Sequence, residues 1–421
     1  MASAIVVGAT GILGREIVKE LSRNPEEWKT IYALSRSKKD EYPSHVVHKH
    51  IDLLSSADQM AKDLQGVEAE YIFFTAYLQK DTEQENWEVN GDMLSNFLTS
   101  LNHTKTQRIL LVTGAKQYGV HLGPPKNPLL ESDPWLPIPP YPPNFYYRQQ
   151  TLLHTFCAAR PPIYWTVTYP NDVIGFATGN FMNLATGIAL YAAVTRELTT
   201  TTNKEKLELP FPGSPTFYTR FDTFTSAPLH ARFCAWAVRD PRAADQAFNV
   251  VNGDAQSWVD LWPRVARRFG MVVRADQFSK DKTGGGGGGG GWEWEEGCAG
   301  RRELGGAPPV GVVAEEVGLV GAGVVEEGGV LEQRVSLVKW SGKGEVRVAW
   351  ERLAEREGLQ RDVFGKATWA FVDFVLGRNY DVVQSMSKAR AAGWTGYQDT
   401  WEAFSDVFDE LEEAKVVPKI R

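Results

Sequence analysis

Residues 6–14 of this chain read Val-Val-Gly-Ala-Thr-Gly-Ile-Leu-Gly and are the most informative for its fold. Their three glycines follow an apolar run and precede a helical pattern. In this setting the first glycine permits a tight turn, the second lets the backbone approach a pyrophosphate, and the third allows close packing of helix on strand. A pyrophosphate would then sit on the helix N-terminus. The predicted ligand contacts are Gly8, Thr10, Gly11, Ile12 and Gly14.

The residues that follow this turn alternate short apolar runs with amphipathic stretches. The apolar runs typical of strands are 4–7, 30–34, 46–51, 71–75, 108–112 and 164–168. The stretches with helical periodicity are 13–21, 57–64, 85–101 and 146–158. Such alternation predicts a parallel sheet with helices on both faces, and the preference for right-handed crossovers favours a doubly wound, Rossmann-type α/β fold.

The pattern loosens beyond about residue 175. We assign residues 1–175 to a nucleotide-binding domain, and 176–282 with 344–421 to a smaller, mostly helical substrate-binding lobe that partly returns to the sheet. The helices expected there are 180–191, 226–238, 257–269, 350–356, 369–376, 382–391 and 400–414. A further strand is expected over 247–251.

Residues 283–343 differ in composition from the rest of the chain. They open with eight glycines, Gly284–Gly291, and continue rich in Gly, Glu and Val. Such a segment buries too little apolar surface to offset its ordering entropy, which predicts a disordered or weakly ordered insertion. Short strands over 310–313 and 317–325, or an error in the gene model, are the open alternatives.

Charge and cysteine content exclude several classes of protein. A net charge of -7 argues against a nucleic-acid partner, because no positive surface is concentrated. The three cysteines and the histidines have no metal-ligand spacing, so we expect neither a metal site nor a disulfide framework. The longest apolar stretch, Leu184–Val194, is about half of the ~20 residues that a membrane span needs. We expect a cytoplasmic protein without a membrane partner, and a homodimer is compatible with the sequence.

The end of the second predicted strand bears on the choice of cofactor. NAD-binding proteins usually place an acid there to bind the ribose 2′-hydroxyl. Here the strand ends in Ser35-Arg36-Ser37, and no acid occurs before Asp40. Arg36 can bind a 2′-phosphate in bidentate fashion and the serines can donate to it, which favours NADP or NADPH. The alternative is a solvated basic loop.

Residues after three other predicted strands complete the expected cofactor site. Asp52 and Leu53 follow the third strand, where an acid can meet the adenine amino group, although Asp52 could instead cap the next helix. Residues 75–77, Thr-Ala-Tyr, follow the fourth strand and are expected beside the nicotinamide ribose. Val173 follows the sixth, where backbone groups could hold the nicotinamide. These predicted contacts are Asp52, Leu53, Thr75, Ala76, Tyr77 and Val173.

A lysine and a tyrosine from separate segments are the candidate catalytic pair. The chain contains no tyrosine followed four residues later by lysine, the helical spacing usual in short-chain dehydrogenases. Lys116 instead follows the fifth predicted strand, at the sheet edge where functional residues gather. Tyr146 opens the next predicted helix, and we expect it in the same crevice.

Several motifs in order resemble the progesterone 5β-reductase/iridoid synthase family of extended short-chain dehydrogenases. The resemblance covers nearly the whole chain except about 283–343. The motifs that carry it are 8–14 (GATGILG), 82–86 (TEQEN), 113–118 (TGAKQY), 144–147 (NFYY), 248–254 (FNVVNGD), 385–388 (SMSK) and 416–418 (VVP).

The resemblance implies an NADPH-dependent 1,4-reduction of an activated enone in specialised metabolism. It also implies that Lys116 and Tyr146 are catalytic, with the tyrosine hydroxyl donating to the enolate oxygen and the lysine adding positive charge nearby. The chain departs from the family pattern at Gln117, where a histidine is usual, and at Gln149-Gln150, where an acidic pair is usual. These departures put the identity of the substrate in doubt.

An apolar small molecule is the expected substrate, because aromatic residues gather near the predicted crevice. The candidate pocket residues are Phe145, Phe181, Met182, Phe217 and Tyr218. Two other functions stay open for the same residues: a carbonyl reductase or alcohol dehydrogenase that uses the same Tyr/Lys pair, and a non-catalytic NADP-binding regulator. A sugar epimerase is less favoured, because the helical Tyr/Lys motif is missing.

Overall fold

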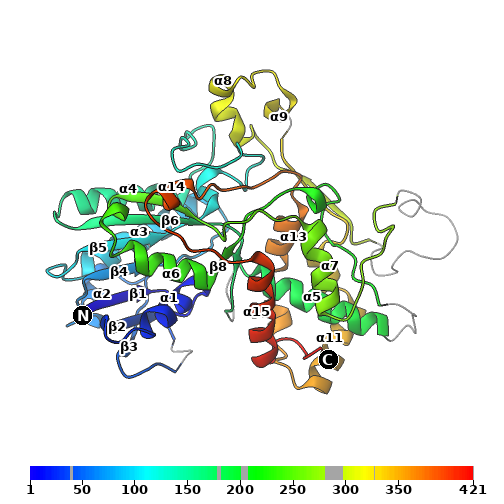
Figure 1. Cartoon of the computed structure of the whole chain (residues 1–421), viewed down its shortest axis with the longest axis horizontal. Helices are drawn as coiled ribbons and strands as arrows, with labels where there is room; N and C mark the ends of the chain where they lie inside the picture. Colours follow the sequence, from blue (N-terminus) through cyan, green and yellow to red (C-terminus); the bar gives the residue numbers. More distant parts are fainter. Residues whose placement is uncertain (38–40, 178–181, 201–206, 280–296, 327, 421) are drawn as a thin grey trace.

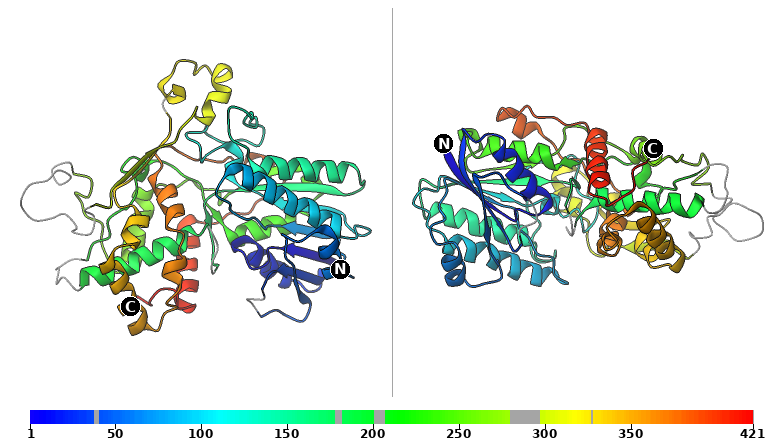
Figure 2. Two further views of the ribbon diagram at one scale, coloured as in Figure 1. Left: turned by 180° about the vertical axis from the view of Figure 1, so that it is seen from behind. Right: turned by 90° about the horizontal axis from the view of Figure 1, so that it is seen from below.

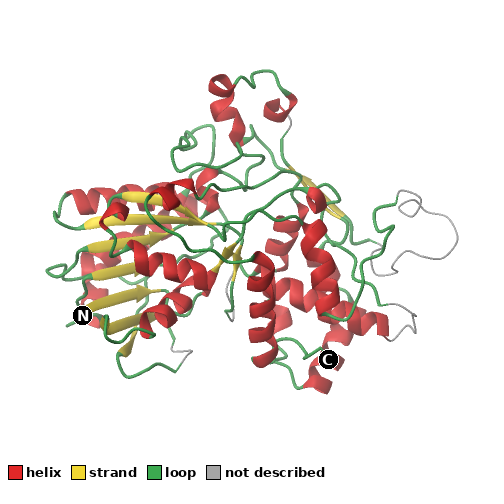
Figure 3. Ribbon diagram, in the orientation of Figure 1, coloured by secondary structure: helices red, strands yellow, loops and turns green. Residues whose placement is uncertain are grey.

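The computed structural model describes residues 1–37, 41–177, 182–200, 207–279, 297–326 and 328–420. Its centre is a seven-stranded parallel sheet with strand order β3-β2-β1-β4-β5-β6-β9 (Figures 1 and 3). The strands are β1 Ala2–Val7, β2 Trp28–Ser35, β3 Val46–His50, β4 Tyr71–Phe74, β5 Arg108–Val112, β6 Tyr164–Pro170 and β9 Gln246–Val250. The strand order reverses beside β1, which is where a doubly wound sheet binds its ligand.

Helices cover both faces of this sheet, as the right-hand view of Figure 2, taken from below, shows. Two lie on one face and pack on each other, α1 Ile12–Ser22 and α6 Ala227–Ala237. Three lie on the other, α2 Ala57–Asp63, α3 Glu83–Ser100 and α4 Phe145–Ala158. The predicted Rossmann-type α/β fold is therefore confirmed, and the predicted strands and helices of this part of the chain agree with the structure to within two residues at each end.

The period of two in the strand sequences explains why both faces are covered. In β1, Ile5 and Val7 belong to the core that includes Phe97 of α3, whereas Ala4 and Val6 belong to the core that includes Ile17 of α1. Neighbouring side chains of a strand point to opposite faces, so an uninterrupted apolar run must be buried on both. Because the strands are apolar throughout, each face of the sheet is covered by a layer of helices.

The second part of the chain forms a helical lobe beside the carboxyl ends of the strands (Figure 1). Its longer helices are α5 Leu184–Thr200, α7 Trp258–Arg268, α11 Gly344–Glu357, α13 Trp369–Gly377 and α15 Thr400–Glu413. They enclose a separate core in which Tyr191, Trp262 and Trp340 are fully buried. Among the described residues, no helix is both long and apolar enough to cross a membrane.

One predicted helix of this lobe is wrong for most of its length. The pattern over 382–391 predicts a helix, but α14 covers only Ser387–Ala391. Val382 instead pairs with Asp222 and Gln384 with Leu129 in isolated bridges, so these residues run extended alongside other segments. Both side chains are buried there, because the extended segment is covered on two sides. An apolar residue at every second or third position fits either conformation, and tertiary contacts decide between them.

The segment expected to be weakly ordered contains regular structure where it is described. β10 Gly300–Glu303 pairs antiparallel with β11 Val330–Gln333. Between them lie η5 Pro309–Val313, α8 Ala314–Val317 and α9 Gly323–Glu326, and α10 Leu337–Ser341 follows. The suggestion of short strands over 310–313 and 317–325 is wrong for the described residues, and the glycine run 284–291 lies outside them. Order arises because Val335, Leu337 and Trp340 are buried in the core of the lobe.

The remaining short elements join the sheet to the lobe. Their bounds are β7 Val173–Ile174, β8 Thr225–Ser226, η1 Ala115–Tyr118, η2 Phe217–Thr219, η3 Pro241–Ala243 and α12 Val363–Lys366. β7 and β8 form a parallel pair just beyond the end of β6. The chain therefore passes from sheet to lobe at the carboxyl edge of the sheet, where the predicted site residues also lie.

Candidate active site

A cavity of about 330 Å³ opens between the carboxyl ends of the strands and the lobe. Its wall combines the start of α1, the ends of β4, β5 and β6, the start of α4, and α13. Predicted site residues in this wall are Gly11, Ile12, Gly14, Thr75, Tyr77, Lys116, Phe145, Tyr146, Val173 and Met182. The structure thus brings together residues that are up to 171 positions apart in the sequence.

The glycine turn has the close approach that its sequence predicts. Gly8 has φ +82°, a left-handed conformation that favours glycine. A Cβ on Gly14 would lie 2.2 Å from the Gly8 carbonyl oxygen, so only glycine fits where α1 crosses the turn. The Thr75 hydroxyl donates to the Val7 carbonyl oxygen at 2.7 Å and ties β4 to the same turn. Thr10 lies in the turn but outside the cavity wall.

The N-terminus of α1 faces the cavity without a side-chain cap. Gly11 is its N-cap residue and has no side chain that could accept from the first-turn amides. Those amides and the helix dipole attract an anion. This arrangement suits the pyrophosphate of a dinucleotide.

The end of β2 lies farther along the same edge of the sheet. The Ser35 hydroxyl donates to the Ser37 carbonyl oxygen at 2.9 Å and lies 3.0 Å from His48 Nε2, so it is engaged within the protein. Arg36 and Ser37 are exposed. Of the three residues predicted to bind a 2′-phosphate, Arg36 and the Ser37 hydroxyl therefore remain accessible.

Asp52 does not cap α2. The Ser56 hydroxyl accepts from the Gln59 amide and caps that helix, whereas Asp52 Oδ1 accepts from the Leu54 amide in a local turn. Asp52 is half-buried, two residues beyond the end of β3. Leu53 packs against the core on this side of the sheet.

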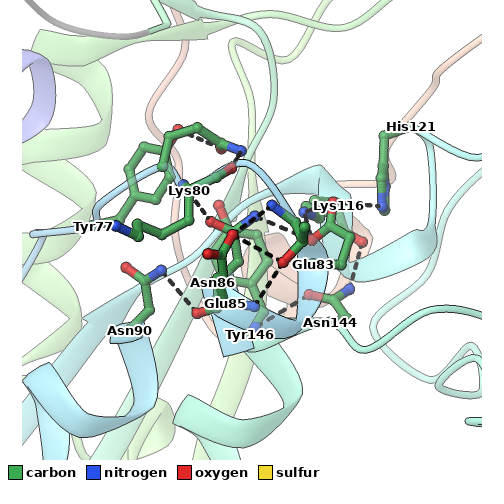
Figure 4. Close-up of polar contacts among 12 residues, drawn as sticks. Tyr77, Lys80, Glu83, Glu85, Asn86, Asn90, Lys116, His121, Asn144 and Tyr146 are labelled. Carbon is green, nitrogen blue, oxygen red and sulfur yellow. Dashed lines mark hydrogen bonds and ion pairs between the residues drawn. The ribbon is translucent and has the colours of Figure 1, made fainter. Parts of the chain in front are cut away.

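Lys116 stands on η1, directly after β5, and its ammonium is paired. Its Nζ lies 2.7 Å from Glu83 Oε1 and 2.6 Å from Oε2, at the first residue of α3 (Figure 4). Burial lowers the pKa of Lys116, and the Glu83 carboxylate opposes that shift. The same Nζ lies 5.3 Å from the centre of the Phe145 ring, a favourable cation–π distance.

Tyr146 lies on the first turn of α4, with its hydroxyl against Gly114. A Cβ on Gly114 would lie 3.2 Å from that hydroxyl, so the glycine leaves room for it at the end of β5. The side chain is buried, and burial together with the Glu83 carboxylate raises the pKa of Tyr146. The phenol therefore stays protonated at neutral pH and is suited to donate a hydrogen bond.

Two asparagines hold the loop between β4 and α3 over the cavity (Figure 4). Asn86 Oδ1 accepts from the Lys80 amide and Asn90 Oδ1 accepts from the Leu78 amide, both at 2.8 Å. The loop presents Tyr77, whose ring stacks on Phe145 at 5.7 Å between centres. Ala76 packs against the sheet and does not reach the cavity wall.

Two of the three unusual glutamines, Gln117 and Gln150, form a buried network with Tyr169. Gln150 Nε2 donates to Gln117 Oε1 at 2.8 Å, and the Tyr169 hydroxyl donates to Gln150 Oε1 at 2.7 Å. Gln149 donates separately to the Asn90 carbonyl oxygen at 3.2 Å. Positions 117 and 150, at which the chain departs from the family pattern, are therefore in direct contact.

A buried ion cluster supports the cavity wall beyond β6. Arg378 Nη2 pairs with Asp172 Oδ2 at 2.5 Å and with Asp222 Oδ2 at 2.6 Å. Asp172 lines the cavity next to Val173, and Arg378 directly follows α13 of the lobe. Removing one partner of such a buried cluster is strongly destabilising, so the cluster ties the sheet edge to the lobe.

One side of the cavity is largely apolar, but not all of the predicted aromatics reach it. Phe145 and Met182 line it, and Phe181 lies outside the described residues. Phe217 lies instead beneath Arg378, whose guanidinium carbon is 4.7 Å from the centre of the Phe217 ring. Tyr218 packs against the lobe core. Two residues of α13 take their place, Phe371 and Phe374. Helical periodicity marks residues such as these as apolar but does not indicate which of them face a pocket.

Three polar residues of the site were not recognised in the sequence. Glu83 lies within the motif 82–86, and Asn144 within 144–147, so the motifs pointed to both positions without giving their contacts. His121 lines the cavity with Nε2 4.0 Å from Glu83 Oε1. Burial and the Lys116 ammonium hold the pKa of His121 well below its usual range. Within the described ranges, no group of three or more His, Cys, Asp or Glu side chains could hold a metal ion.

The fold and site together define an oxidoreductase of the extended short-chain dehydrogenase class. Residues 4–284 match the family model described as the PRISE-like Rossmann-fold domain, and the chain belongs to that family. An uncharacterized protein of Schizosaccharomyces pombe is 38% identical, with 99% of this chain and 98% of that protein covered. The resemblance drawn from the motifs is therefore confirmed.

Two plant relatives have informative names. An (S)-8-oxocitronellyl enol synthase of Nepeta racemosa is 28% identical, with 99% of this chain and 93% of that protein covered. A 3-oxo-Delta(4,5)-steroid 5-beta-reductase of Arabidopsis thaliana is 27% identical over the same shares of the two chains. The relatives with named activities are oxidoreductases.

Proposed function

We propose that this protein is an NADPH-dependent reductase that adds hydride to the β-carbon of an apolar enone. The observation that carries the proposal is that the start of α1, Lys116 and Tyr146 all line one cavity of about 330 Å³. A cofactor held at the helix N-terminus and a substrate carbonyl at the tyrosine would meet in this space.

The residues present fit NADPH. The backbone amides of Gly11–Gly14, which no side chain caps, suit its pyrophosphate. Because Gly8 and Gly14 have no side chain, α1 can pack closely against the turn that presents these amides. Exposed Arg36 suits the 2′-phosphate, since a guanidinium binds phosphate in bidentate fashion. Asp52 and Val173 stand where the adenine and the nicotinamide would lie. When bound, the cofactor supplies the hydride.

Tyr146 and Lys116 would stabilise the oxygen of the substrate. The protonated phenol donates a hydrogen bond to the carbonyl oxygen, and the ammonium adds positive charge as that oxygen becomes an enolate. A well-placed donor of this kind contributes about 3–4 kcal/mol to the transition state. The enolate then takes up a proton at the α-carbon, which gives the saturated carbonyl compound.

The relatives and the wall of the cavity support the substrate class. The name of one relative specifies a 3-oxo-Δ4,5-steroid, a conjugated enone, and that of the other an oxocitronellyl enol. Phe145, Phe371 and Phe374 give this cavity an apolar wall that suits such compounds.

Product analysis with purified protein tests the proposal. The protein is mixed with NADPH and progesterone, 2-cyclohexen-1-one or 8-oxogeranial, and absorbance loss and products are followed. We expect saturated carbonyl products, with turnover reduced about 10²–10³-fold in Tyr146→Phe and strongly reduced in Lys116→Ala. Tyr164→Phe, at an exposed tyrosine of β6, is the matched control. Allylic alcohols would indicate carbonyl reduction instead, and NADPH binding without turnover of any enone or carbonyl compound would favour a regulator.

A further inference from the structure

Glu83 and Lys116 form a two-point contact inside the cavity. Both carboxylate oxygens of Glu83 lie within hydrogen-bond distance of Nζ, at 2.7 and 2.6 Å, although the residues are 33 positions apart. Their side chains are only 28% and 19% exposed, so water screens the pair less than it would a surface ion pair. An ammonium has three N–H donors, and this contact can engage two of them.

The first turn of α3 fixes the position of Glu83. Thr82 caps the helix by accepting from the Glu85 amide, while Glu85 Oε2 accepts from the Thr82 amide at 3.0 Å. This reciprocal capping box holds the residues on either side of Glu83. Asn86 anchors the preceding loop through the Lys80 amide, as Figure 4 shows. The carboxylate is therefore presented to the cavity from a rigid turn rather than from a loose loop.

We propose that Glu83 is the positioning residue for Lys116, holding its ammonium charged and oriented within the cavity so that the remaining N–H serves the substrate oxygen. This inference rests on the proposed function of the Lys/Tyr pair. Glu83 itself acts through Lys116 and has no role in taking or giving the hydride.

The groups around the pair determine what loss of the carboxylate does. His121, Tyr77 and Tyr146 face it from three other segments, and the Phe145 ring lies against the ammonium. Burial and the nearby Lys116 ammonium keep the pKa of His121 well below its usual value, whereas burial raises the pKa of both tyrosines, so all three are neutral at pH 7. Burial lowers the pKa of Lys116, and Glu83 opposes it. Without Glu83 the ammonium loses its proton at lower pH.

The pH dependence of kcat/KM in Glu83→Gln tests this role. Glutamine keeps an acceptor oxygen and the side-chain length but removes the charge. We expect the alkaline limb of the profile to move down by about one to three pH units, since a close opposite charge shifts a pKa by that amount. Glu88→Gln, at an exposed glutamate of the same helix, is the matched control and should leave the profile in place. A Glu83→Gln profile that coincides with the wild-type profile would overturn the inference.

A double-mutant cycle separates positioning from a merely structural role. If Glu83 acts through Lys116, then Glu83→Gln reduces kcat/KM in the wild-type background but changes it less than about two-fold in the Lys116→Ala background. An equal loss in both backgrounds would mean that Glu83 acts on something other than Lys116, and the proposal would fail.

A labelling experiment that needs no substrate keeps this inference distinct from the proposed function. The rate of Lys116 acetylation by acetic anhydride is followed against pH by mass spectrometry, because only the neutral amine reacts. We expect Lys116 to react at lower pH in Glu83→Gln than in wild type, while the Glu88→Gln control is unchanged. If the labelling shifts but the protein reduces no enone, the result supports the role of Glu83 in the ion pair. It then contradicts only the proposed substrate class. Turnover of enones with no shift in labelling would refute the role of Glu83.

Discussion

The side-chain amide of Asn144 donates a 2.8 Å hydrogen bond to the backbone carbonyl oxygen of Lys116. Its other atom, Oδ1, accepts from the Tyr146 amide at 3.1 Å and caps α4. Asn144 is only 4% exposed, so both bonds are protected from water. One buried side chain thus fixes the segment that carries the candidate lysine relative to the helix that carries the candidate tyrosine.

Separating the two bonds of Asn144 gives a first prediction. Asn144→Ser keeps a cap acceptor but loses the donor to Lys116, whereas Asn144→Ala loses both. We expect kcat/KM to fall at least about ten-fold in both variants, because small misplacements of reacting groups are costly. The free energy of unfolding should be about 1 kcal/mol lower for the alanine variant than for the serine variant, the value of a helix cap. Full activity in Asn144→Ser would show that the bond to Lys116 does not position it.

The sequence sufficed to predict that Lys116 and Tyr146 share a crevice. Carboxyl ends of neighbouring parallel strands lie at one edge of a sheet, so a lysine after β5 and a tyrosine at the start of the next helix must converge there. The contact of Glu83 with Lys116 could not be predicted in this way. This contact depends on the path of the loop between β4 and α3. Asn86 and Asn90, which follow this loop in the sequence, fix that path by accepting hydrogen bonds from its backbone amides.

Long-range packing also explains why the end of the chain was harder to predict. Phe217 and Phe374 both belong to the lobe and both lie near the Arg378 guanidinium, yet only Phe374 lines the cavity. Composition likewise predicted weak order for 283–343, since glycine and glutamate dominate there. Burial of a few large residues such as Trp340 overrides that composition locally.

Arg36 carries the second prediction, which concerns cofactor choice. Arg36→Ala removes the guanidinium expected at the 2′-phosphate, and hydrogen bonds to charged groups contribute about 1.5–3 kcal/mol. We expect the Kd for NADPH to rise by roughly ten-fold or more, while the Kd for NADH changes little. Fluorescence titration of both cofactors measures this, and Arg23→Ala, at an exposed arginine of the loop after α1, is the control. Equal weakening of both cofactors would place Arg36 away from the 2′-phosphate.

Trp340 tests whether the segment after the glycine run is part of the lobe. Its side chain is fully buried and packs edge-to-face on Tyr191 at 5.0 Å and on Trp369 at 5.7 Å. Trp340→Ala should lower the free energy of unfolding by about 3–5 kcal/mol, and Trp340→Phe by less, because less volume is lost. Urea denaturation measures both. A loss below about 1 kcal/mol for the alanine variant would mean that this segment does not pack as described.

His230 gives a prediction about acid stability. It is fully buried on α6, where Nε2 lies 3.0 Å from the Thr168 hydroxyl. Burial lowers the pKa of His230 to about 3, whereas an unfolded histidine titrates near 6.5. Between these values the unfolded chain binds one proton more than the folded one at this site. The contribution of neutral His230 to the free energy of unfolding is therefore fully present above about pH 6.5 and is lost as the pH falls toward 3.

The matched substitution His230→Gln keeps a group that can hydrogen-bond to Thr168 but cannot become charged. Between pH 6.5 and 4.5 the wild type should lose about 2–3 kcal/mol more unfolding free energy than the variant, at about 1.4 kcal/mol per pH unit. His103 and His154 also have lowered pKa values because they are buried, but both proteins contain them, so the difference reports His230 alone. Parallel stability curves for the two proteins over this range would mean that His230 takes up its proton in the folded state as readily as in the unfolded one.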